Sequence, residues 1–198
     1  MTNPSLPAPP LSPAEFTALV NRYQRPIFGF IYGLVRNSEQ AHDLTQDTFY
    51  EAWRAGSQQR PPFRGASQPE DIKAWLFQVA YNRAISTLRR HRLIAFESFE
   101  ARSEHYPDYP DRSGSFEADV AEREMLHAAL ASLPPADVAC LMLRVVQGFS
   151  AAEAGAILGA SPAAVHKQLF RAKERLRKAY LAQEEHSHKA RRREDTYR

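Results

Sequence analysis

The chain has 198 residues, with 26 Lys and Arg, 23 Asp and Glu, and a single cysteine, Cys140. One cysteine excludes an internal disulfide and a multi-cysteine zinc site, and no apolar run reaches the roughly 18 residues of a membrane-spanning helix. The opening residues lack the basic and apolar regions of a signal peptide, so we expect a cytoplasmic protein without membrane insertion.

Charge is distributed in three blocks along the chain. Residues 10–95 carry a net charge of +4, residues 96–133 carry −6, and residues 134–198 carry +5. Two basic blocks around an acidic one indicate two domains that face a polyanion, joined by a linker. Ordinary surface patches would give the same pattern, so charge alone does not decide between these interpretations.

The first predicted helix follows a proline-rich start. Residues 1–11 contain four prolines and no charge, and we expect them to be disordered. The sequence SPAE at 12–15 then has the form of a helix start, because Ser12 can cap the helix and Glu15 can complete a capping box. Apolar residues at helical spacing continue to Ile31, and Pro26 predicts a kink or break in this helix near Arg25.

Two further helices are expected in the first basic block. One begins near Ser38 and runs to about residue 55, and a loop rich in Gly, Pro and Ser covers residues 56–70. The next helix spans about residues 71–91. Its apolar stripe includes Trp75, which we therefore interpret as a core residue rather than as a platform for a nucleic-acid base.

The acidic segment 96–118 has no clear periodicity and is predicted to be a linker with little fixed structure. Helices are expected again at 118–130 and at 135–147, and the last dozen or so residues have the composition of a frayed, charged tail. No strand pattern is present. The predicted fold class is therefore all-α, with two small helical domains joined by a flexible acidic linker.

Two short helices at 151–158 and from 162 onward have the signature of a helix-turn-helix. Ser150 can cap the first helix, Gly159 stands where the chain must turn, and Ser161 can cap the second helix ahead of Pro162. In this motif the second helix enters the major groove of DNA. A basic amphipathic helix is often only a solvated surface, but two capped helices around a turn glycine favour DNA binding.

A separate signal lies in the stretch DLTQDTFYEAW at 43–53. Asp43 and Asp47 are four residues apart and Gln46 adjoins them, so one helix face presents two carboxylates and an amide. This face is either simply solvated or meets basic and amide groups of another protein.

At this point the sequence resembles the sigma-70 family of bacterial RNA polymerase specificity subunits, and within it the extracytoplasmic-function (ECF) group. The motifs that carry the resemblance are DLTQDTF at 43–49, FRG at 63–65, KAWLFQVAYNRAISTLRR at 73–90, LASLPPAD at 130–137 and GFSAAEAGAILGASPAAVHKQLFRA at 148–172. It implies a disordered N-terminus at 1–11, a region 2 domain at 12–95, an acidic linker at 96–118, a region 4 domain at 119–182 and a charged tail at 183–198.

The resemblance also implies roles for individual residues, which fall into three groups. The helix at 43–49 would bind the clamp helices of the polymerase β′ subunit, and the region 4 domain would dock on the β flap. The expected polymerase contacts are Asp43, Gln46, Asp47 and Phe49. The expected contacts to the −10 element are Phe63, Asn82, Arg83, Arg89 and Arg90. The expected contacts to the −35 element are Ser161, Ala163, Ala164, His166, Lys167, Phe170 and Arg171.

The function implied is that of a sigma factor, which brings core RNA polymerase to promoter DNA and helps to melt it. The alternative is a stand-alone helix-turn-helix regulator, which would have no need of the motifs at 43–49 and 63–90. We do not expect an enzyme, because no nucleophile–base set, phosphate loop or metal-ligand spacing is present, and we expect no cofactor or metal. The family further implies an anti-sigma factor as an inhibitory partner.

Overall fold

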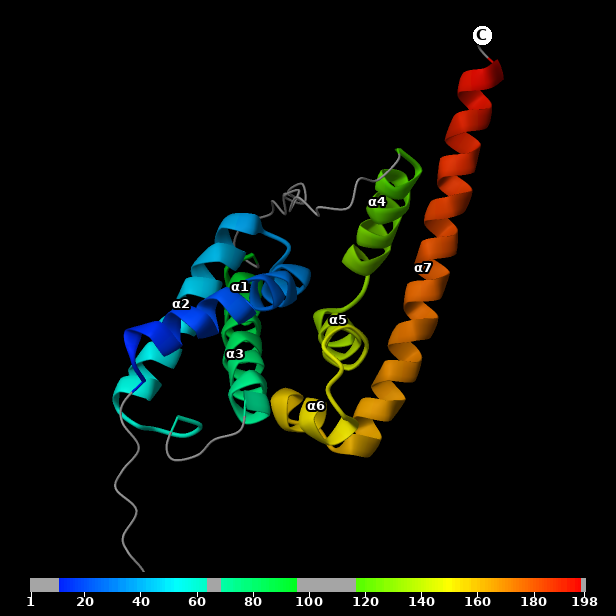
Figure 1. Cartoon of the computed structure of the whole chain (residues 1–198). Coiled ribbons are helices and arrows are strands. Elements are labelled where there is room, and N and C mark those ends of the chain that lie inside the picture. Colours follow the sequence, from blue (N-terminus) through cyan, green and yellow to red (C-terminus); the bar gives the residue numbers. More distant parts are fainter. Residues whose placement is uncertain (1–10, 64–68, 96–116, 197–198) are drawn as a thin grey trace, which may run out of the picture.

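The structure, a computed structural model, describes residues 11–63, 69–95 and 117–196, and these residues form helices without any strand. Figure 1 shows α1, α2 and α3 packed together, with α4 to α7 beside them. The helices are α1 Pro13–Val35, α2 Ser38–Ser57, α3 Pro69–Ala95, α4 Glu117–Ala131, α5 Pro135–Leu141, the π-helix η1 Met142–Val146, α6 Ala151–Leu158 and α7 Pro162–Thr196. The predicted fold class is confirmed. The predicted N-terminal disorder and most of the predicted linker lie outside the described residues.

Helix α1 begins as the sequence predicts but does not break. The Ser12 hydroxyl accepts a hydrogen bond from the Glu15 amide, and the Glu15 carboxylate accepts one from the Ser12 amide, which together make a capping box. The helix continues through Pro26, contrary to the prediction of a break near Arg25. Buried side chains on both sides of this proline, among them Tyr23 and Ile27, hold the helix together by tertiary packing.

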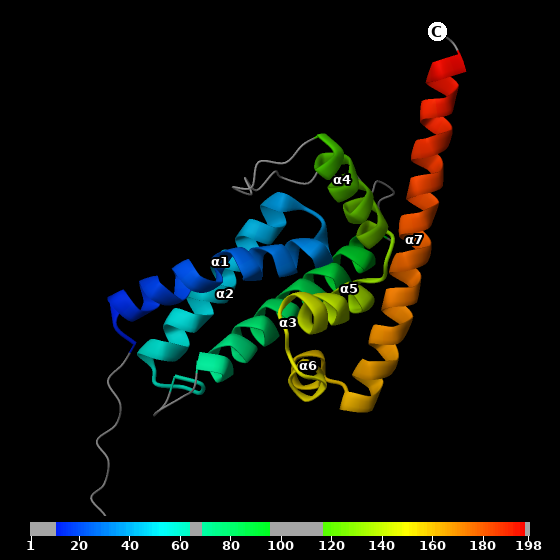
Figure 2. The ribbon, with the colours of Figure 1, turned by 45° about the vertical axis from the view of Figure 1, so that its right-hand side comes forward.

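The core is one continuous cluster of buried residues that includes members of both predicted domains. Phe30 of α1 and Phe77 of α3 are fully buried and meet edge to face, with ring centroids 5.2 Å apart. Trp75 packs against this cluster, so its interpretation as a core residue is confirmed. Figure 2 shows α3 lying between the first two helices and α5 and α6, so the two domains pack directly on each other.

The segment at 135–147 differs from the single helix predicted. The chain leaves α5 at Leu141 and forms a π turn, in which the Gln147 amide donates to the Met142 carbonyl at 2.9 Å. This wider turn keeps Leu143 fully buried while Met142 packs on the first domain at Gly33. Neither the burial of Leu143 nor the packing of Met142 on Gly33 can be predicted from the local sequence.

The predicted charged tail is also different, because α7 continues as a helix to Thr196. Residues 183–196 contain neither glycine nor proline and are rich in Arg and Glu, which favour helix. Figure 1 shows the far end of α7 projecting beyond the rest of the fold. No helix in the described part of the chain carries an apolar stretch long enough to cross a lipid bilayer.

Candidate nucleic-acid interface

The polar stripe predicted on α2 lies on the surface. Asp43, Gln46 and Asp47 are exposed, while Leu44, Thr45 and Thr48 of the same helix are buried. Residues three and four apart share one face of a helix, so the two carboxylates and the amide form one contiguous acidic surface. This surface can accept hydrogen bonds and salt bridges from a basic partner.

Phe49 is not part of this surface. Its side chain is 6% exposed and belongs to the core, so it contributes packing rather than exposed surface here, and its contact with polymerase stays a prediction. The exposed aromatic residue beside the stripe, which the sequence reasoning did not place there, is Tyr50: it is 61% exposed, and the Arg54 guanidinium lies 6.0 Å from its ring centroid. Helical spacing alone could have found it, since Tyr50 follows Gln46 and Asp47 by four and three residues.

An ion pair connects the α2 surface with α3. Arg83 donates to the Asp47 carboxylate at 2.9 Å, and the two side chains are 32% and 57% exposed. The predicted polymerase contact and the predicted phosphate contact are therefore partners of each other in this structure. Arg90 donates to the Thr87 hydroxyl at 3.2 Å and remains exposed, as does Arg89.

Phe63 and Asn82 are not brought together in the described residues. The Phe63 ring meets Trp75 edge to face with a centroid separation of 5.6 Å. Asn82 is seven residues after Trp75, which is about 10 Å along an α-helix. The loop residues 64–68 that would complete the predicted base pocket lie outside the described residues. Phe63, which precedes α3 and packs on Trp75, and Asn82 on α3 are therefore separate points along this helix.

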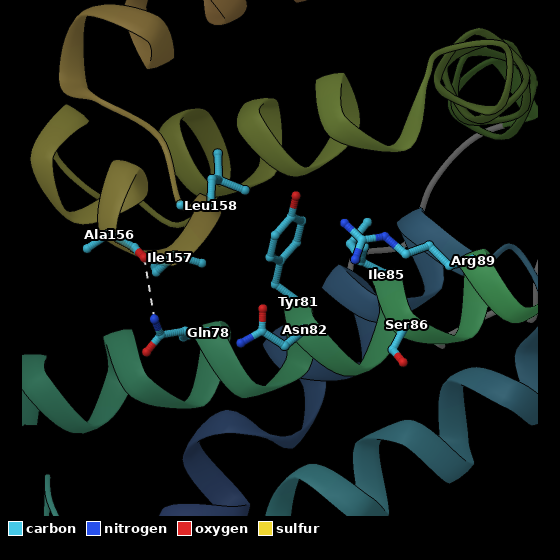
Figure 3. Close-up of a pocket in the computed structure, with 10 residues that line it drawn as sticks. Gln78, Tyr81, Asn82, Ile85, Ser86, Arg89, Ala156, Ile157 and Leu158 are labelled. Atoms are coloured by element: carbon cyan, nitrogen blue, oxygen red, sulfur yellow. Dashed lines mark hydrogen bonds between the residues drawn. The ribbon is translucent and has the colours of Figure 1, made fainter.

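Asn82 instead lines a cavity between α3 and α6. The cavity has a volume of about 280 Å³, and Figure 3 shows Tyr81 and Asn82 on the side of α3 that faces α6. Burial raises the pKa of the Tyr81 hydroxyl, although the positive charge of Arg89 opposes this shift. The cavity offers an amide, a neutral phenol and a guanidinium, which together can bind a polar or anionic group.

The helix-turn-helix has the geometry predicted for it. Ser150 and Glu153 form a capping box at the start of α6, and Gly159 ends that helix in the left-handed region with a φ of 67°. The Ser161 hydroxyl accepts a hydrogen bond from the Ala164 amide at 3.2 Å at the start of α7. Ile157 and Val165 are buried between the two helices.

The predicted DNA-reading side of α7 is open to solvent. All seven predicted residues are exposed: Ser161, Ala163, Ala164, His166, Lys167, Phe170 and Arg171. Phe170, a large apolar side chain, is 70% exposed on this side. Further along α7, Arg175 pairs with the buried carboxylate of Asp137 and fixes the helix to α5.

Two family models match the chain. The model described as Sigma-70 region 2 matches residues 19–94, and the model described as Sigma-70, region 4 matches residues 123–176, so together they account for more than half of the sequence. The first match covers α1 to α3, apart from the start of α1, and the second runs from within α4 to within α7. The two matches therefore lie on separate groups of helices, α1 to α3 and α4 to α7.

Several curated relatives have similar sequences. The RNA polymerase sigma factor CarQ of Myxococcus xanthus is 32% identical over 163 residues, which are 82% of this chain and 87% of the relative. The ECF RNA polymerase sigma factor SigE of Mycolicibacterium smegmatis is 29% identical over 164 residues, 83% of this chain and 60% of the relative. The chain spans about half the length, 48%, of SigG of Mycobacterium tuberculosis, another ECF sigma factor.

Solved structures share the fold. The sigma factor RpoE of Bartonella quintana, determined in complex with the anti-sigma factor NepR, has a TM-score of 0.67 and 25% identity over 83% of this chain and 96% of its own. CnrH in complex with the cytosolic domain of CnrY, at 23% identity and a TM-score of 0.60, has the same fold over 86% of this chain and 90% of its own. By its two matching regions and its similarity to CarQ, this chain belongs to the sigma-70 family of RNA polymerase sigma factors, within the ECF group.

Proposed function

We propose that this protein binds core RNA polymerase, directs it to promoters with particular −10 and −35 elements, and helps to melt the DNA. The observation that carries the proposal is the exposed acidic stripe of Asp43, Gln46 and Asp47 on α2, in the same chain as a capped recognition helix. A stand-alone regulator needs only the recognition helix. The acidic stripe complements a basic protein surface, for which we propose the clamp helices of the β′ subunit.

For the −10 element we propose that α3 supplies the contacts. Asn82 can both donate and accept hydrogen bonds, which suits the edge of an unpaired base, and Arg83, Arg89 and Arg90 can bind phosphates on the same strand. Flipping a base out of the duplex costs a few kcal/mol, and stacking on an aromatic ring such as Phe63 returns about 1–3 kcal/mol per base. The half-buried Phe63 ring is held in place by Trp75.

For the −35 element we propose that the first turns of α7 enter the major groove. Residues at the start of a recognition helix reach base edges, while later basic residues reach phosphates. His166 and Lys167 are exposed near this start, and Arg171 follows one turn later. We further propose that the region 4 domain docks on the polymerase β flap and that the acidic linker passes toward the RNA exit path.

We also propose an anti-sigma factor as a regulatory partner. Two sigma factors of the same fold were determined in complex with the proteins that bind them, RpoE with the anti-sigma factor NepR and CnrH with a domain of CnrY. The exposed stripe on α2 and the exposed Phe170 on α7 are surfaces that such a protein could cover.

The proposal is tested by charge reversal on α2, followed by pull-down with purified core polymerase and by promoter-specific transcription. Asp43→Arg and Asp47→Arg should each weaken core binding at least tenfold, because they place a like charge against a basic surface. Asp43→Arg is the cleaner variant, since Asp47 also holds Arg83. Glu70→Arg is the matched control, because Glu70 is exposed at the start of α3 and lies outside the stripe on α2.

Two results would contradict the proposal. One is unchanged core binding by both stripe variants. The other is nanomolar binding to −35 DNA by the protein alone, combined with no start-site selectivity on core polymerase at any template. The second result would instead favour a stand-alone regulator.

A further inference from the structure

We propose that Glu51 of α2 is a positioning residue for the −10 contact: it holds the turn at 60–63 in place and thereby fixes where Phe63 presents its ring. This inference rests on the proposed function, in which the Phe63 ring stacks on an unpaired base, and it names a further residue on which that contact depends. Glu51 does not itself touch DNA in this arrangement, because it acts through Arg60.

Helix α2 ends in a tight reversal that leads directly into the turn at 60–63. The Gln59 amide donates to the Gly56 carbonyl at 3.2 Å and the Arg60 amide donates to the Ala55 carbonyl at 2.9 Å, a pair of hydrogen bonds typical of a Schellman motif. Glycine usually occupies the left-handed position of this motif, but here the residue is Gln59, with a φ of 51°. Because a side chain is disfavoured at this φ, contacts beyond the backbone are needed to keep the reversal in this form.

The Glu51 carboxylate supplies such a contact from within α2. Arg60, nine residues further along the chain, donates to one of its oxygens at 2.9 Å. Arg54, one turn along the same helix, donates to the other oxygen at 3.4 Å. The carboxylate therefore joins the body of α2 to the first residue of the turn that carries Phe63.

The turn at 60–63 transmits this restraint to the aromatic ring. The Phe63 amide donates to the Arg60 carbonyl at 2.8 Å, which closes the turn, and the two prolines between these residues have restricted φ angles. The Phe63 ring packs edge to face on Trp75 of α3, with the centroids 5.6 Å apart. A ring that is held before DNA arrives loses less conformational entropy when a base stacks on it, so binding is stronger.

Helical spacing alone would make Glu51 a continuation of the acidic stripe, since it follows Asp47 by four residues. Its surroundings favour a different role. The Glu51 side chain is 22% exposed, compared with 57% for Asp47, and each of its two carboxylate oxygens already accepts from an arginine. Less of this carboxylate is therefore available to a partner protein.

The charge of Glu51 gives the inference a sign that a purely electrostatic role cannot reproduce. A carboxylate near a DNA-binding surface repels phosphates, so its neutralisation would strengthen DNA binding if charge alone mattered. If Glu51 positions the Phe63 ring, Glu51→Gln should instead weaken the stacking contact. The two roles predict changes in opposite directions.

The first experiment measures the surroundings of the Phe63 ring without polymerase. The full-length protein is labelled with 5-fluorotryptophan, and the fluorine resonances of its two tryptophans are assigned with Trp53→Phe. Phe63→Leu gives the position of the Trp75 resonance when the neighbouring ring is absent. Glu51→Gln should move the Trp75 resonance toward that position, because the ring is no longer held against Trp75.

Two arginines on one carboxylate provide the controls. Arg54→Gln is the matched control, since it removes one partner of Glu51 but leaves the contact with Arg60, and it should not move the Trp75 resonance. Arg60→Gln should reproduce the shift of Glu51→Gln, and the double variant should shift no further, because both changes break the same contact. Urea midpoints should stay close to that of the wild type, since partly exposed ion pairs contribute little to stability.

The second experiment uses holoenzyme reconstituted with core polymerase. Open-complex formation is measured on a promoter identified by mapping transcript starts, with one abasic site placed in turn at each −10 position of the nontemplate strand. The wild type should lose about tenfold at the position whose base stacks on Phe63, and Glu51→Gln should reduce this ratio to about twofold, because formation on the intact template falls. A role in stability or core binding alone would lower both templates equally and leave the ratio unchanged.

The outcomes separate the positioning role from the sigma role. A Trp75 resonance that Glu51→Gln leaves in place, a wild-type abasic penalty that it leaves unchanged, or stronger open-complex formation by this variant each overturns the inference. Loss of core binding as large as that of Asp43→Arg would assign Glu51 to the stripe and also overturns it. If the resonance moves but the wild-type holoenzyme tolerates every abasic site, Glu51 positions the ring and the base contact proposed for Phe63 fails.

Discussion

Two helical glycines provide a test of how the turn of the helix-turn-helix is built. A Cβ atom added at Gly155 in α6 would lie 2.5 Å from the backbone oxygen of Ala160, whereas one added at Gly29 in α1 would meet nothing within 4 Å. The Ala160 amide also donates to the Gly155 carbonyl at 2.9 Å, so the two segments are held together at this point. A backbone oxygen cannot swing aside as a flexible side chain can, and Gly155→Ala must therefore widen the turn.

The expected magnitudes have opposite signs at the two positions. Alanine in place of glycine inside a helix stabilises by about 0.5–1 kcal/mol, and Gly29→Ala should show this gain. At Gly155 the gain is opposed by overpacking, which costs about 1–3 kcal/mol, and by a weakened hydrogen bond that contributes about 0.5–1.5 kcal/mol. Gly155→Ala should therefore destabilise by about 1–3 kcal/mol, a fall in Tm of about 3–10 °C for a chain of this length.

The assay is urea denaturation of the full-length variants, followed by two signals. Both tryptophans, Trp53 and Trp75, lie in the first domain, so their fluorescence follows α1 to α3 while far-ultraviolet circular dichroism follows all helices. Gly155→Ala should lower the dichroism midpoint, and Gly29→Ala should raise the fluorescence midpoint. A Gly155→Ala variant as stable as the wild type would refute the close approach of α6 to the turn.

Three further outcomes are expected from single groups in the second domain. Hydrogen bonds from Ser150 lower the pKa of Glu153 in the folded protein. The ionised carboxylate therefore stabilises the fold at every pH above the ordinary pKa of a glutamate. This contribution is lost as the pH falls through the lowered pKa. Ser150→Ala should cost about 1 kcal/mol near neutral pH and should weaken the acid-dependent loss of stability in denaturation curves between about pH 6 and pH 3. Burial raises the pKa of the Cys140 thiol, with a smaller effect from Asp137. Iodoacetamide at pH 8 should therefore alkylate Cys140 at a rate that rises steeply with urea concentration. Rapid labelling without denaturant would contradict the burial of Cys140. Arg175→Ala leaves the buried Asp137 carboxylate without its ion-pair partner and should lower the urea midpoint by the equivalent of about 1–3 kcal/mol. Arg175→Lys should recover part of that loss. Equal midpoints for the wild type and both variants would show that the ion pair contributes nothing to stability.

Local signals in the sequence predicted local structure well. Ser12, Ser150 and Ser161 each cap a helix as expected, and Gly159 has the positive φ that its turn requires. Each of these features depends on residues within four positions of one another, so the printed sequence contains the information needed.

Predictions failed where distant parts of the chain decide the outcome. Phe49 belongs to the motif that the family resemblance assigns to polymerase binding, yet packing of α2 on α1 and α3 places its side chain in the core. The π turn at 142–146 and the direct packing of the two domains also depend on contacts between residues more than 70 positions apart, such as Lys73 with Gln147. Helical periodicity cannot show which apolar face meets a neighbouring element and which charged side chain reaches a distant carbonyl.

The unbroken course of α7 has a mechanical consequence. At 1.5 Å per residue, the 35 residues from Pro162 to Thr196 make a rod about 52 Å long. The first turns of α7 are those that would lie in the DNA groove, so its C-terminal end amplifies any change in orientation. A 10° rotation of the helix axis about these first turns would displace the C-terminal end by about 9 Å. A fluorophore or spin label placed near Thr196 would magnify small differences in how the rod is seated on different promoter sequences.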